Sequence, residues 1–270
     1  MRQFERLEME STKQSFQWPQ KYDLFGVGVT ATTYEEAVNI AIRAAQSRTP
    51  TTVTALAVHG LITARRENAL KAQINSFEMV VPDGQPVRWA LNKLYHTGLT
   101  DRVYGPELMI RLCKRASELG IGIYLYGSHK NIVEGLSENL RDRFPLLKVV
   151  GCEPSIFRPL TPAEDRDLVS RINKSEAGFV FFGLGCPLQE KFAYDHRDNI
   201  KSVQVCVGAA FDFHSGNKKM APGWMQRSGF EWLYRFGQEP RRLWRRYLVT
   251  NSIFVMRFCL QFLRLKFSWA

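Results

Sequence analysis

Short apolar segments with high β propensity alternate with amphipathic helical patterns through most of this 270-residue chain. Proline and glycine mark one helix between Pro106 and Gly120, and Thr33 and Thr161 each begin a capping-box pattern with a glutamate three residues later. Parallel strands need helical crossovers, so the alternation predicts an α/β fold, a Rossmann-like and mostly parallel sheet with helices on both faces. The expected strands are 24–30, 52–58, 78–81, 121–126, 147–150, 177–182 and 202–207.

Composition excludes several other classes of protein. With 45% hydrophobic and 23% charged residues, the chain is ordinary globular protein rather than a disordered one. Its five cysteines are scattered and form no C-x-x-C pair, which argues against a disulfide scaffold or a thiolate zinc site. Residues 1–22 contain no apolar core of a signal peptide. A cytoplasmic protein is therefore expected.

Positive charge is concentrated at the C-terminal end. Residues 213–270 hold eleven lysines and arginines but two acids, which accounts for +9 of the net charge of +11. This asymmetry predicts three parts: a polar tail (1–22), an α/β catalytic domain (23–221) and an Arg-rich helical appendage (222–270). The appendage should face something anionic, and nucleic acid, a phosphorylated substrate and an acidic membrane all fit.

The end of the appendage has the pattern of an amphipathic helix. One narrow polar stripe runs along an otherwise apolar segment and consists of Arg246, Thr250, Arg257, Gln261, Arg264 and Ser268. The longest uncharged run, 247–256, is too short to span a bilayer, so a helix lying in the membrane interface is expected. The alternative is a helix that packs its apolar face on the domain core.

Unusual loops follow the expected strands. Asp83 comes directly after the strand pattern at 78–81, and Asp212 follows the one at 202–207. Ligands of such sheets bind at the carboxyl ends of the strands, where Asp83 could act as a general base and Asp212 could bind sugar hydroxyls. Asp83-Gly84 is equally an ordinary turn sequence.

Glycines and one glutamine mark a candidate nucleotide or diphosphate site at the same edge. Gly127 ends one strand pattern, and Gly183 and Gly185 lie between another strand and a helix. Glycine permits close approach of backbone to phosphate, and a helix N-terminus favours its charge. Gln189 in the first turn of that helix could bind a sugar or a base. The dinucleotide and P-loop fingerprints are both incomplete.

Metal ligands are not evident in the sequence. The five histidines are isolated, and no Asp-x-Asp pair occurs, so neither a metal nor another cofactor is expected. The charge of a departing diphosphate would then be met by arginines. Arg235, Arg242 and Arg245 have a spacing that places them on one helical face.

Five stretches of the chain carry a family resemblance: VVPDGQPVRWAL (80–91), DRVYGPELMIRLCKRASELGIGIYLYGS (101–128), PLLKVVG (145–151), FVFFGLGCPLQEKF (179–192) and the long segment VGAAFDFHSGNKKMAPGWMQRSGFEWLYRFGQEPRRLWRRYL (207–248). In this order they resemble the WecG/TagA/CpsF family of bacterial glycosyltransferases over about residues 24–248.

The resemblance implies an inverting transfer of a sugar from a UDP-sugar to a sugar on undecaprenyl diphosphate, in the synthesis of a wall polymer or exopolysaccharide. The expected donor sugar is of the N-acetylmannosamine type. By motif matching, Asp83 would deprotonate the acceptor hydroxyl. Thr54, Arg102 and Gln189 would line the pocket, while Arg235, Arg242 and Arg245 would close over the diphosphate. The enzyme would lie at the inner face of the cytoplasmic membrane, with its oligomeric state open.

Three positions depart from the family pattern. Leu56 stands where the family often has asparagine, Glu107 replaces an aspartate, and Ser128 replaces a second glycine. These changes make a different hexose or a uronic acid an alternative donor sugar.

Two other functions fit parts of the sequence. A nucleotide-dependent oxidoreductase could use a similar sheet, although the fingerprint glycines and the acidic ribose partner are incomplete. A nucleic-acid-binding module could use the basic segment with Trp224, Trp232 and Trp244 as stacking platforms. The dense apolar surface around the polar stripe suits lipid better, so no nucleic-acid partner is expected.

Overall fold

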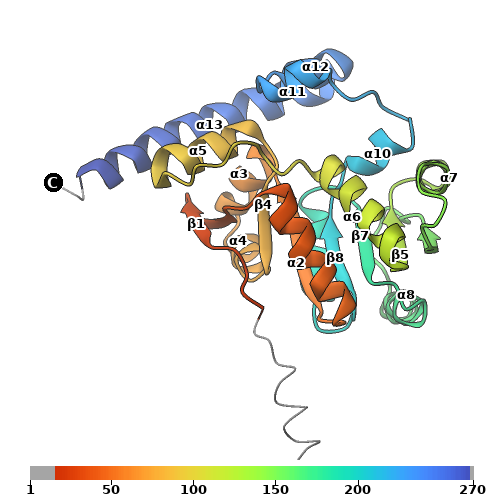
Figure 1. Cartoon of the computed structure of the whole chain (residues 1–270). Coiled ribbons are helices and arrows are strands. Elements are labelled where there is room, and N and C mark those ends of the chain that lie inside the picture. The colour runs from red at the N-terminus through yellow and green to blue at the C-terminus, as the bar shows by residue number, and fades with distance from the viewer. Residues whose placement is uncertain (1–15, 268–270) are drawn as a thin grey trace, which may run out of the picture.

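The computed structural model describes residues 16–267, apart from the side chains of Arg242, Arg245 and Arg246. A six-stranded sheet in the order β4-β3-β8-β7-β5-β6 forms its centre, and every neighbouring pair of strands is parallel (Figure 1). The strands are β3 (Thr51–Leu56), β4 (Met79–Pro82), β5 (Ile123–Gly127), β6 (Val149–Glu153), β7 (Phe179–Gly183) and β8 (Val203–Cys206). The predicted α/β class is confirmed.

Helices cover both faces of this sheet. They are α2 (Tyr34–Gln46), α3 (Val58–Arg66), α4 (Asn68–Asn75), α5 (Gln85–Tyr95), α6 (Gly105–Leu119), α7 (Lys130–Arg143), α8 (Pro162–Lys174), α9 (Leu188–Asp195) and α10 (Ala210–His214). Alternate residues of each strand enter two separate cores. Phe179 and Phe181 pack with α2, α6 and α7, whereas Val180 and Phe182 pack with the helices of the opposite face.

The N-terminal strand prediction is wrong in one respect. The segment 24–30 belongs to a hairpin of β1 (Lys21–Leu24) and β2 (Val27–Thr30), because Phe25 and Gly26 adopt φ values of 61° and 93° and reverse the chain. The hairpin is a separate sheet beside β4, where Thr30 Oγ1 accepts a hydrogen bond from Val80 N at 2.9 Å. Phe16 and Trp18, from the predicted tail, also pack against the core.

The helix caps largely follow the sequence. Thr161 and Glu164 form the complete capping box, and Gly120 ends α6 in the left-handed conformation with φ 68°. Thr33 accepts from the backbone N of Glu36, but the Glu36 carboxylate accepts from Thr32 Oγ1 at 2.7 Å. The N-terminal box is therefore half formed.

Three further helices, α11 (Gly223–Arg227), α12 (Glu231–Gln238) and α13 (Pro240–Phe267), form a layer across the top of the domain (Figure 1). The inner face of α13 packs against α3 and α5, where Thr250 and Phe254 are buried. Gln261 fixes its far half to the hairpin, because its side chain donates to Asp23 O at 2.8 Å and accepts from Phe25 N at 3.1 Å. Part of the polar stripe thus faces the protein.

The opposite face of α13 is apolar and exposed. We call this set the outer face, and it consists of Leu248, Val249, Val255, Met256, Leu260, Leu263 and Phe267. By length and composition, the segment Tyr247–Phe267 could cross a membrane, so the argument from its longest uncharged run is wrong. One such helix is weak evidence for a span, and the contacts of its inner face hold α13 along the domain surface.

Candidate active site

Asp83 lies at the carboxyl end of β4, where it is partly buried beneath the C-terminal layer. Its Oδ1 accepts a hydrogen bond of 2.6 Å from the backbone N of Gly105, the first residue of α6. A Cβ at Gly105 would lie 3.1 Å from Ala55 Cβ, so glycine brings the helix this close to the carboxylate. Asp83 therefore sits against a helix N-terminus, which stabilises its charged form.

Burial nevertheless dominates the acidity of this group. It raises the pKa of Asp83 to about 6, against the opposing effects of the Arg102 charge and the Gly105 N–H. The Glu231 charge also raises the pKa, while Arg235 lowers it. A carboxylate with this pKa is a suitable general base near neutral pH.

A buried ion pair joins the C-terminal layer to this part of the domain. Arg102 Nη2 contacts Glu231 Oε2 at 2.5 Å, and the two side chains are 8% and 9% exposed. Tyr104 donates its hydroxyl to Glu231 Oε1 at 2.9 Å, and the Arg102 guanidinium lies 4.1 Å from the centre of the Tyr104 ring. Arg102 is thus held next to Asp83 by a residue of α12.

Arg235 completes this cluster. Its Nη1 lies 3.9 Å from Glu231 Oε1, its guanidinium lies over the Phe213 ring, and its charge acts on the pKa of Asp83. The structure therefore brings three predicted site residues together: Asp83, Arg102 and Arg235. Arg235 belongs to α12, whereas Arg242 and Arg245 belong to α13, so the prediction of one shared helical face is wrong. The predicted roles of Arg242 and Arg245 concern side chains outside the described residues.

Gln189 and Thr54 form a second cluster, organised by a buried carboxylate. Glu190 Oε1 accepts from Thr54 Oγ1 and from Gln189 Nε2, each at 3.0 Å, and burial raises the pKa of Glu190. Thr54 is fully buried, and its hydroxyl holds this carboxylate. Within residues 16–267, Gln189 Oε1 accepts no hydrogen bond, and the space beside it is kept by Gly208, whose Cβ would lie 3.3 Å away.

The predicted glycines lie at the ends of β5 and β7, where the order of the strands in the sheet reverses. The connection after β5 leads to β6 on one side, whereas that after β7 leads to β8 on the other, and such switch points are the usual ligand crevice. Gly127 has φ 131°, and its Cβ would lie 2.7 Å from the carbonyl carbon of Gly183. Gly185 has φ 78° and open space around it. Close packing therefore demands glycine at position 127.

This packing predicts unequal costs for two alanine substitutions. Gly127→Ala combines an unfavourable backbone conformation with overpacking and should lower the free energy of unfolding by about 2–5 kcal/mol. Gly185→Ala, the control, carries the backbone cost alone, about 1–2 kcal/mol. Urea denaturation of both variants measures the difference, and equal losses would contradict the steric argument.

The contacts of Asp212 are made with the loop that follows it. Its Oδ1 accepts from Asn217 Nδ2 at 3.0 Å and lies 3.8 Å from Lys218 Nζ, so the carboxylate stabilises the loop that leads to α11. Of the three departures from the family pattern, Leu56 is a core residue, 1% exposed. Glu107 pairs with Arg111 at 2.7 Å, and Ser128 has φ 56° beside Gly127.

The sequence did not identify three residues of these clusters: Tyr104, Glu190 and Glu231. Glu190 follows Gln189 directly, so its signal was available in the same motif. Glu231 precedes Arg235 by one helical turn, but nothing local indicates its partner 129 residues away. In the part of the chain that the structure describes, no group of three or more His, Cys, Asp or Glu residues is placed to hold a metal ion.

Fold and site together define an α/β protein with a candidate ligand site at the carboxyl edge of its sheet, next to a basic helical layer. The chain belongs to the glycosyl transferase WecG/TagA/CpsF family, whose model matches residues 22–268.

Two relatives are each named N-acetylglucosaminyldiphosphoundecaprenol N-acetyl-beta-D-mannosaminyltransferase. The protein of Bacillus subtilis strain 168 is 33% identical over 177 residues, which cover 65% of this chain and 66% of the relative. That of Bacillus spizizenii strain W23 is 31% identical over 179 residues, 66% of this chain and 67% of the relative. The matched part therefore spans about two thirds of each relative.

Proposed function

We propose that this protein is an inverting glycosyltransferase that moves a sugar from a UDP-sugar to a sugar on undecaprenyl diphosphate. The observation that carries the proposal is Asp83, a carboxylate of raised pKa at the strand edge, next to Arg102 and Arg235. The relatives' names support a lipid-linked acceptor and a donor sugar of the N-acetylmannosamine type. A related hexose or a uronic acid is the alternative donor sugar.

In the proposed reaction, Asp83 takes the proton of the acceptor hydroxyl. The acceptor oxygen then forms a bond to the anomeric carbon as the bond between that carbon and the UDP oxygen breaks. One displacement inverts the anomeric configuration. Guanidinium groups of the basic layer, including that of Arg235, stabilise the negative charge that develops on the departing UDP. The proposal includes neither a metal nor another cofactor.

The donor would occupy the crevice beside Gly127 and Gly183. Of the glycines in this crevice, Gly185 has open space around it, so its backbone permits close approach by a diphosphate. The free acceptor atom Gln189 Oε1, held in place by Glu190, would receive a hydrogen bond from the sugar or the uracil ring. Glu190 then acts as a positioning residue.

The proposal is tested by measuring UDP release from a panel of UDP-sugars, with polyprenyl-diphosphate-N-acetylglucosamine as acceptor. We expect acceptor-dependent release with one donor, which also identifies the transferred sugar. NAD(P) binding without UDP binding would instead indicate an oxidoreductase, and absence of release and of UDP binding would overturn the proposal.

The outer face of α13 supports a location at the inner surface of the cytoplasmic membrane, where the acceptor would lie. Burial of a leucine side chain in an apolar phase contributes about 1.5–3 kcal/mol to the free energy of membrane binding. A glutamate at the same position loses this contribution, and its negative charge is repelled by anionic lipid. Leu263→Glu should therefore lower binding to anionic lipid vesicles about tenfold or more in co-sedimentation. Leu146→Glu is the control, because Leu146 is also exposed (75%, against 48% for Leu263) but precedes β6, away from α13. Equal effects of the two changes would refute a specific role of this face.

A further inference from the structure

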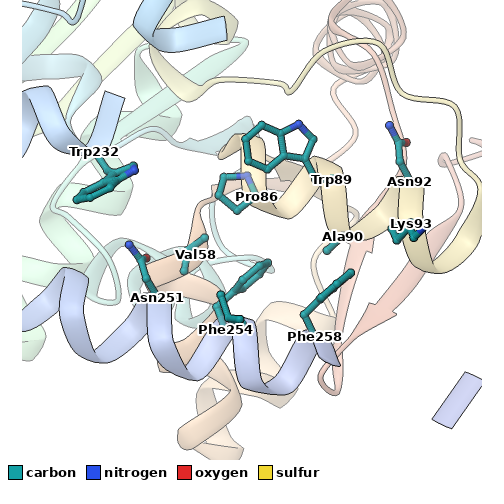
Figure 2. Close-up of a pocket in the computed structure, with 11 residues that line it drawn as sticks. Val58, Pro86, Trp89, Ala90, Asn92, Lys93, Trp232, Asn251, Phe254 and Phe258 are labelled. Atoms are coloured by element: carbon teal, nitrogen blue, oxygen red, sulfur yellow. The ribbon is translucent and has the colours of Figure 1, made fainter. Parts of the chain in front are cut away.

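An apolar groove lies between α5 and α13, below α12. Figure 2 shows its side chains around a common space. The volume is about 680 Å³, within the range of small-molecule sites, which is about 300–1,000 Å³. Its walls include Val58, Pro86, Trp89, Trp232, Phe254 and Phe258. Asn92, Lys93 and Asn251 also line the groove, but its exposed surface is mostly apolar, so a charged sugar or a nucleotide does not fit its chemistry.

One end of the groove adjoins the candidate active site. Pro86 lies three residues after Asp83, in the first turn of α5. Trp232 directly follows Glu231, which holds Arg102 beside Asp83. Anything bound along this groove therefore has its inner end near the proposed base and near guanidinium groups.

The groove also reaches the outer face of α13. Val255 lines the groove and belongs to the outer face, where 59% of it is exposed. Trp89 and Trp232 are 45% and 40% exposed despite their apolar surroundings. An open apolar channel of this kind leaves large side chains in contact with water unless something covers them.

We propose that this groove binds the first isoprene units of the acceptor's polyprenyl chain, so that part of the lipid leaves the bilayer and lies on the protein. The inference rests on the proposed function, which supplies a diphosphate-linked lipid as substrate. A single molecule would then occupy both sites: its diphosphate lies near the arginines, its first isoprene units lie between α5 and α13, and the remaining chain leaves the groove at Val255 and enters the membrane.

The test compares two neighbouring residues of the outer face. Val255→Glu places a carboxylate in the groove, whereas Met256→Glu places one on the same exposed face outside it. Each variant is assayed in detergent with two acceptors, one with a polyprenyl chain and one whose diphosphate carries only an ethyl group.

Val255→Glu should lower kcat/KM for the polyprenyl acceptor about tenfold and change that for the ethyl acceptor less than about twofold. Met256→Glu should change neither by more than about twofold. Equal effects of the two variants on the polyprenyl acceptor would overturn the groove as a lipid site.

A binding measurement separates this inference from the proposed function. Farnesol, titrated without detergent, should quench or shift the tryptophan fluorescence of the wild-type protein and of Met256→Glu, but not of Val255→Glu. Farnesol binding without sugar transfer would refute the proposed function but support the groove as a lipid site. Sugar transfer with farnesol binding unaffected by Val255→Glu would refute the groove and leave the function. A Val255→Glu variant that sediments at a lower mass than the wild type would identify a second copy as the occupant, which also overturns the proposal.

Discussion

Asp83→Asn is expected to lower kcat by about 10²–10⁴-fold, the usual contribution of a general base, while UDP affinity changes less than about twofold. Asparagine keeps the shape of the side chain and an Oδ1 that can accept from Gly105 N, but it cannot take a proton. UDP-release kinetics and calorimetric titration with UDP measure the two quantities. Unchanged turnover would remove Asp83 from the mechanism.

The pH profile provides a second measure of the same role. Because burial raises the pKa of Asp83 to about 6, kcat/KM should fall as the pH decreases through this value, about tenfold for each further unit. The residual activity of Asp83→Asn should lack this acidic limb. A limb that persists in the variant would have to belong to another group.

Protein stability then distinguishes a catalytic loss from misfolding. The pKa of Asp83 is about 6 in the folded protein against 3.8 for an ordinary aspartate, so the folded state holds the proton more tightly. Wild-type stability therefore declines from about pH 4 to pH 6 relative to the Asn variant. Above pH 6 we expect Asp83→Asn to be at least as stable as the wild type, and below pH 4 this advantage should vanish. Urea denaturation at pH 3.5 and pH 7 measures both differences.

Local sequence signals accounted for most of the domain. Each strand of the central sheet begins within two residues of its predicted first residue. The helix caps at Thr161 and Gly120 are also as predicted. The hairpin was missed because its turn uses Phe25 at positive φ, a conformation that only tertiary packing selects for this residue. Position 25 has neither glycine nor asparagine, the residues that would indicate such a turn.

Long-range pairing explains what the sequence could not predict. Periodicity separates the two faces of α13, but it does not say which of them meets the protein. Gln261 decides this, because it binds backbone atoms of the hairpin that lie more than 230 residues earlier. Arg102 was recognised as a site residue by motif matching. Its partner Glu231 was not, because the two residues are 129 positions apart in the sequence.

Glu231→Ala should have the largest effect on stability among changes in this cluster. It removes the ion-pair partner of Arg102, whose side chain is 8% exposed, and the acceptor of the Tyr104 hydroxyl. Breaking a buried ion pair in this way costs about 3–5 kcal/mol, as seen in urea denaturation. The exposed pair Lys130–Glu134 serves as control, and Glu134→Ala should cost about 0–1 kcal/mol.

If α11–α13 detached in this variant and exposed Arg102 to water, the loss of stability would be smaller. In that case hydrogen exchange in α12 should accelerate in Glu231→Ala while the amides of β7 stay protected. If the layer stays attached instead, the catalytic profile reports the change: removal of the Glu231 charge, which raises the pKa of Asp83, should move the acidic limb of kcat/KM below pH 6. A variant with wild-type stability, unchanged exchange and an unmoved limb would show that Glu231 neither anchors the layer nor acts on the proposed base.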